Sequence, residues 1–189
     1  TLTGKEWTLA LGSRDINGTF ISGATVSGTA TGDNTEWERC FFNVASVASG
    51  EFHDCSFAGT ATGGLTLSAA GDYRFINCQP GTTAATAPVF TLGTAPVTAE
   101  FRRWSGDITI AGIASGDTVL LSGTFGVITL QGISGTVEVR GTYEQITDSR
   151  TGGPSLSKVG AILGQDVVSI LSTLSTGVAL AAGAVNDAS

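Results

Sequence analysis

The sequence predicts a mainly β protein: a right-handed parallel β-helix, or solenoid, of about seven rungs, followed by a C-terminal α-helix. Three observations predict this class. Bulky apolar residues recur about every 20 residues, apolar-Thr-apolar triplets recur in the same stretch, and one short block is followed 18 residues later by a block with chemically similar residues at most positions. The right-handed coil follows from the strong crossover preference of parallel strands.

The first observation is a ladder of apolar residues that each open a strand-like run. Its members are Phe20, Trp37, Phe52, Phe75, Phe101, Val119 and Val137. A chain that returns to the same side-chain type at this interval makes one coil per return. In three of the runs a cysteine follows three positions later, at Cys40, Cys55 and Cys78. A straight strand would place anchor and cysteine on opposite faces, so either a bulge or a corner must lie between them.

The second and third observations indicate at least two strands in each turn. Apolar-Thr-apolar triplets occupy residues 65–67, 90–92, 108–110 and 128–130, as expected for strands with one buried face. The block at 118–126 is echoed at 136–144, which indicates two adjacent rungs. From these repeats we expect a core that includes Phe101, Trp104, Val119, Leu121, Val137 and Val139.

The chain divides into three predicted parts. Residues 1–15 form an N-terminal capping strand that shields the open end of the solenoid, and residues 16–150 form the parallel β-helix. Residues 151–189 contain a linker, whose turn-forming composition already begins at 147, and an oligomerisation or docking helix.

The predicted C-terminal helix starts at Ser157, which can cap it. One apolar stripe follows helical spacing at Leu163, Val167, Ile170 and Leu174. Such a helix is too short and too apolar to stand alone in water, so we expect this stripe to form an interface between copies of the chain. A membrane span is less favoured, because the segment is rich in Ser and Thr and has no basic flank. A disordered tail is the other, less favoured alternative.

Charge and cysteine content restrict the function further. The formal net charge is -7, and no run of basic residues is present, which argues against nucleic acid as a partner. The three cysteines sit at like positions in successive rungs, which favours buried free thiols over a disulfide or a metal site. Free thiols suit assembly in a reducing compartment, and no cofactor is expected.

Several stretches carry a family resemblance. Residues 72–78, 88–90, 100–108 and 135–141 resemble small β-helical structural proteins of tailed bacteriophages, and the similarity covers roughly residues 15–180. The resemblance implies a virion protein of the tail, neck or head-fibre apparatus that mediates assembly or attachment and is assembled in the bacterial host cytoplasm. It also implies a homotrimer with other phage structural proteins as partners, and it supplies no catalytic residues.

Some phage β-helices cleave host polysaccharide with a pair of carboxylates in a groove, so acidic surface groups are candidates for such a site. Glu36, Trp37, Glu38 and Glu51 fall on neighbouring rungs and form a candidate glycan or receptor surface. Paired carboxylates could also serve a polysaccharide depolymerase, but solvated surface acids are the simpler reading, and we expect no enzyme activity. His53 lacks a nucleophile pattern beyond Cys55, and the Thr-x-Thr steps at 29–31 and 60–62 are a weak indication of ice binding.

Overall fold

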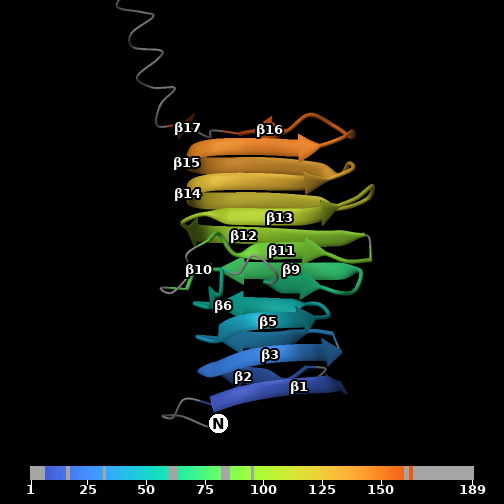
Figure 1. Cartoon of the computed structure of the whole chain (residues 1–189), viewed down its shortest axis with the longest axis vertical. Helices are drawn as coiled ribbons and strands as arrows, with labels where there is room; N and C mark the ends of the chain where they lie inside the picture. Colours follow the sequence, from blue (N-terminus) through green and yellow to red (C-terminus); the bar gives the residue numbers. More distant parts are fainter. Residues whose placement is uncertain are drawn as a thin grey trace, which may run out of the picture.

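The chain forms a β-solenoid in the computed structural model, which describes residues 7–15, 18–31, 33–59, 64–81, 86–94, 96–159 and 162–163. Figure 1 shows the strands stacked from β1 at one end to β16 and β17 at the other, with about seven turns between. In chain order the strands are β1 (Trp7–Asp15), β2 (Phe20–Ser22), β3 (Ala24–Thr31), β4 (Thr35–Glu38), β5 (Phe41–Val47), β6 (Gly50–His53), β7 (Ser56–Phe57), β8 (Leu65–Leu67), β9 (Gly71–Ile76), β10 (Gln79–Pro80), β11 (Val89–Leu92), β12 (Val97–Ser105), β13 (Ile108–Ile113), β14 (Thr118–Gly132), β15 (Thr136–Arg150), β16 (Ser157–Lys158) and β17 (Ile162–Leu163).

Each turn pairs with the next through parallel strands in register. One side of the solenoid is built by β4, β6, β9, β12 and the first halves of β14 and β15. The opposite part of each turn is built by β5, β8, β11, β13 and the second halves of β14 and β15. The parallel fold predicted from the repeats is therefore confirmed.

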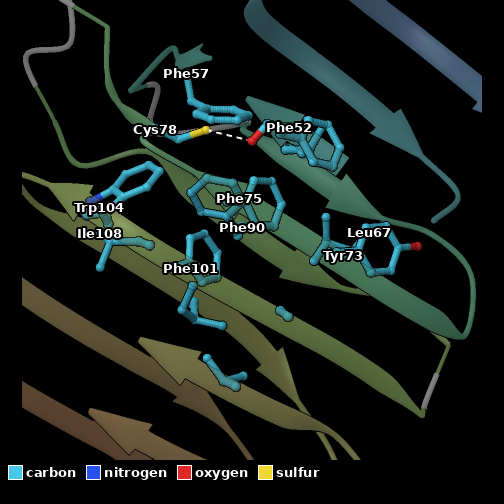
Figure 2. Close-up of a cluster of buried hydrophobic side chains, with 14 of the residues drawn as sticks. Phe52, Phe57, Leu67, Tyr73, Phe75, Cys78, Phe90, Phe101, Trp104 and Ile108 are labelled. Carbon is cyan, nitrogen blue, oxygen red and sulfur yellow. Dashed lines mark hydrogen bonds between the residues drawn. The ribbon is translucent and has the colours of Figure 1, made fainter. Parts of the chain in front are cut away.

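Stacked aromatic rings fill the centre of the solenoid. Register places Trp37, Phe52, Phe75 and Phe101 one above another, and all four are fully buried. The centroid of the Phe75 ring lies 4.5 Å from that of Phe52 and 4.5 Å from that of Phe101, with interplanar angles of 15° and 10°. Figure 2 shows Phe52, Phe75 and Phe101 in one column, with Phe90 beside it. This spacing matches the distance between neighbouring parallel strands, so each turn contributes one ring to the column.

A corner residue with left-handed backbone angles lets both the apolar anchor and the cysteine three positions later face inward. The corner residues are Gly23, Arg39, Asp54, Asn77 and Arg103, with φ between 51° and 68°. At these five corners the anchor points inward, the next residue points outward, the corner residue bends the chain, and the following side chain enters the core. A single left-handed residue thus restores the inward direction that a straight strand would lose.

The three cysteines stack directly behind these corners. Backbone bonds from Ser56 N to Cys40 O and from Gln79 N to Cys55 O place them on successive turns, with Trp104 at the same position beyond Cys78. All three thiols are free and buried, as the spacing predicted. The Cys78 thiol donates a hydrogen bond to the carbonyl of Phe52 at 3.3 Å, which Figure 2 marks.

The predicted ladder is wrong at three of its seven positions. Ile21, and not Phe20, pairs with Trp37, and Phe20 is 51% exposed. Gly23 is the corner of that turn, so the inward anchor lies two residues before it.

Val119 and Val137 belong to a neighbouring inward column, because Leu121 and Val139 occupy the places that continue the Phe101 column. Both valines are nevertheless buried, and so are the other expected core residues: Phe101, Trp104, Leu121 and Val139.

The C-terminal region also departs from the prediction. β15 continues through Arg150, so the first residues of the predicted linker belong to a strand. Ser157 lies in β16 and pairs with Glu138, where the sequence predicted the start of a helix. Leu163 lies in β17 and pairs with Tyr143, so its assignment to a helix is wrong. At Leu163 the prediction failed because a strand of two residues is too short to show a periodic pattern in the sequence. Val167, Ile170 and Leu174 lie outside the described residues.

Candidate functional site

One side of the solenoid carries charged side chains on most of its turns, and we call it the charged face. Its side chains point outward from the strands that begin each turn, between the buried anchors. The charged face consists of Glu36, Glu38, Glu51, His53, Asp72, Arg74, Glu100, Arg102, Leu120, Ser122, Glu138 and Arg140. Strand alternation and the left-handed corners thus bring acids and bases from distant parts of the sequence into columns.

Ion pairs run along this face from turn to turn. Arg74 lies on the rung between two acids, with its Nη1 at 2.8 Å from Glu51 Oε1 and its Nε at 3.9 Å from Glu100 Oε2. Glu100 also accepts a hydrogen bond from Arg102 Nε at 2.7 Å. The hydrogen bond from Arg74 holds the pKa of Glu51 below its usual range. Burial of the carboxyl opposes this shift, and a hydrogen bond with His53 adds a smaller lowering. These exposed pairs are individually weak, and their main effect is to neutralise neighbours on a crowded surface.

The first hollow on the charged face lies over β4, β6 and β9. It has a volume of about 300 Å³ and is lined by Asn34, Thr35, Glu36, Gly50, Glu51, Asp72 and Arg74. Gly50 contributes no side chain to this lining, and an added Cβ there would overlap the backbone of Thr35. The hollow is open, and its lining is polar.

The predicted glycan or receptor surface is brought together only in part. Glu36 and Glu51 pair across adjacent strands and line the first hollow. Glu38 points outward on the next column and pairs with Arg39 at 2.9 Å. Trp37 is wrong as a surface residue, because it points inward and is fully buried. The sequence did not single out Asp72 and Arg74 for this surface, although their alternation with buried Tyr73 and Phe75 indicates two outward side chains.

The second hollow is a groove on the charged face, over the first half of β14. It has a volume of about 410 Å³, and its floor includes Leu120 and Ser122. Longer side chains rise on the turns before and after it: Glu100 and Arg102 on β12, and Glu138 with its ion-pair partner Arg140 on β15. A rung with short side chains between two Glu-x-Arg rungs therefore produces a groove parallel to the strands.

Among the residues that the structure describes, the cysteines and His53 do not combine into a nucleophilic centre. A hydrogen bond with the neighbouring Cys55 thiol, followed by burial, raises the pKa of the Cys40 thiol far above its usual range, and the pKa of the Cys55 thiol is raised as well. The Nε2 atom of His53 lies 3.3 Å from Glu51 Oε2 on the outer surface, whereas Cys55 donates to backbone carbonyls inside. A buried thiol that keeps its proton is a poor nucleophile.

Within the described part of the chain, no group of three or more His, Cys, Asp or Glu side chains is arranged to hold a metal ion. The same residues include no helix long and apolar enough to cross a membrane. No protein-family model matches the chain, and no curated protein or solved structure matches it either.

Proposed function

We propose that this chain is a non-catalytic structural component of a bacteriophage virion, in the tail, neck or head-fibre apparatus, where it mediates assembly or attachment. The observation that carries the proposal is the uninterrupted stack of parallel turns with a core of aromatic and aliphatic side chains from β3 to β15. Such a stack makes a stiff body with long lateral faces. The resemblance of residues 72–78 and 100–108 to phage β-helical proteins supports the same proposal.

The proposal includes a homotrimer of right-handed solenoids. The predicted C-terminal helix, with Val167, Ile170 and Leu174 at the interface between chains, remains part of it beyond the described residues. The other partners would be structural proteins of the same virion, and the protein would be assembled in the cytoplasm of the infected bacterium.

Particle composition tests this function. Mass spectrometry of purified particles should detect the chain at a fixed copy number, and cryo-electron microscopy should place a short rod of stacked β-turns in the tail, neck or head fibres. If cells that express the chain release infectious particles that do not contain it, the proposal is refuted.

A second candidate function is binding of a host receptor or glycan, and the first hollow favours it. Glu36, Glu51 and Asp72 supply acceptors for sugar hydroxyls, and Arg74 supplies donors, in a depression open to solvent. The isolated protein should then adsorb to host cells and compete with the virus. Glu36→Gln with Asp72→Asn should reduce adsorption, whereas Thr136→Ser on the same side of the solenoid should not. Release of reducing ends from host polysaccharide would instead indicate a depolymerase and contradict the non-catalytic assignment.

A further inference from the structure

The side of the solenoid built by the second half of each turn has a chemistry opposite to that of the charged face. We call it the uncharged face, and its outward side chains are hydroxyl, methyl and amide groups. They are Thr29, Ser46, Thr66, Val89, Thr91, Thr109, Ala111, Thr129, Gln131, Thr147 and Ser149. None of these outward positions carries a charged side chain. Asp148 and Arg150, which pair with each other at 2.8 Å in the last turn, continue the inward columns of Leu130 and Gly132.

Register arranges these small side chains in straight columns. Thr29, Ser46, Thr66 and Thr91 occupy equivalent places on four successive turns. On the next three turns Thr109, Thr129 and Thr147 form a second column, which is shifted from the first by one outward position along the strand. Between Ser46 and Thr147 five strand spacings of ~4.8 Å give a strip about 24 Å long. Side chains of similar, small size leave this strip even, whereas both described hollows lie on the charged face.

Electrostatics determines which side of the molecule a second copy can approach. The chain has a formal net charge of -7, so two copies repel each other at a distance. On the charged face the acids outnumber the bases, with Glu36, Glu38 and Asp72 lacking an arginine on an adjacent rung of their own column. Bringing two such faces together would juxtapose like charges and strip water from ion pairs. The uncharged face avoids both costs, because β-branched methyls can pack while hydroxyls remain hydrogen-bonded.

We propose that the uncharged face is the lateral contact between copies of this chain, with the solenoid axes side by side and the charged face left toward solvent or other partners. This inference rests on the self-association that the proposed function includes, and it names the surface responsible. It adds a contact along the length of the solenoid to the C-terminal contact predicted from the sequence.

A matched pair of substitutions in one strand tests the inference. Thr129 and Thr118 both lie in β14, point outward and are half-buried, but Thr129 is on the uncharged face and Thr118 is on the side of the charged face. Sedimentation velocity of the full chain should show self-association for the unmodified protein. Thr129→Glu should raise its dissociation constant about tenfold or more, because the new carboxylate would be repeated across the contact. Thr118→Glu and the near-isosteric Thr129→Val should leave it unchanged.

Two further measurements keep the test decisive. The pair Thr109→Glu and Thr98→Glu, on β13 and β12, repeats the comparison one turn away, and circular dichroism confirms that each variant retains its β signal. Association across the uncharged face should strengthen as salt screens the repulsion between acidic bodies, whereas an ion-paired interface would weaken. Equal association of Thr129→Glu and Thr118→Glu would overturn the inference and leave a virion location intact. A chain that is monomeric at all concentrations would overturn both the inference and the proposed trimer.

Discussion

Replacing Phe75 by Ala should cause the largest loss of stability among single aromatic substitutions in this chain. The Phe75 ring is fully buried, stacks on Phe52 and Phe101 at 4.5 Å each, and meets Phe90 edge-on at 5.0 Å. Large-to-small changes at a site of this kind cost about 3–5 kcal/mol, which combines the lost transfer free energy with the cavity that remains. Phe75→Leu preserves most of the volume but removes two stacked ring pairs, and should cost about 1–3 kcal/mol.

The matched control is Phe20→Ala. The sequence predicts that Phe20 belongs to the same ladder of apolar residues as Phe75, but in the structure its side chain is about half exposed to solvent. Since Phe20 is 51% exposed, its replacement should change the free energy of unfolding by no more than ~1 kcal/mol. Urea denaturation followed by circular dichroism gives both values under one set of conditions. Similar losses for Phe75→Ala and Phe20→Ala would refute the register described here.

Three further predictions concern backbone, thiols and pH. Gly141→Ala should destabilise the fold by more than ~1 kcal/mol, because Gly141 has φ 103° and an added Cβ would overlap the Gly123 carbonyl; Gly18→Ala, at φ 63° with open space around it, should cost less in the same urea titration. The three cysteines should resist Ellman's reagent in the native protein and all react in denaturant, and rapid native reaction would contradict their burial. Because Arg74 lowers the pKa of Glu51 in the folded state, Glu51 adds stability above its unfolded pKa of ~4.3, and this stability disappears as pH falls through the lower folded pKa. The urea midpoints of Glu51→Gln and the unmodified protein should therefore converge between about pH 5 and pH 3, and a constant difference would contradict the pairing.

The coil and much of its core followed from the sequence because side-chain repetition survives variation in loop length. Phe52, Phe75 and Phe101 stand at equal places in their turns, and Thr118–Gly126 pairs with its echo residue by residue up to Tyr143. The corner was the missing information. A left-handed residue changes which of its neighbours face inward. Gly23 and Asn77 are residue types that favour this conformation, but Arg39 and Arg103 are not, so the sequence does not reveal those corners.

The candidate site was predicted less well for a related reason. Glu36 and Glu51 were placed together correctly because both precede an aromatic anchor by one position. Trp37 was misassigned because an aromatic residue between two acids fits a sugar-binding surface as well as a buried strand position. The apolar-Thr-apolar triplets already indicate outward threonines on the uncharged face. Their alignment into columns could not be predicted, since loops of unequal length separate residues such as Ser46, Thr66 and Thr91.

Distances along one outward column test the stacking of turns most directly. Glu51 and Glu138 lie in the same column with Arg74, Glu100 and Leu120 between them, so four strand spacings of ~4.8 Å separate their Cα atoms by about 19 Å. Spin labels on cysteines introduced at positions 51 and 138, diluted with unlabelled protein, should give a narrow distribution near that separation. Labels at 36 and 138 should lie one spacing further apart, at about 24 Å. Broad distributions, or a separation that does not increase by one strand spacing from the first pair to the second, would contradict the solenoid.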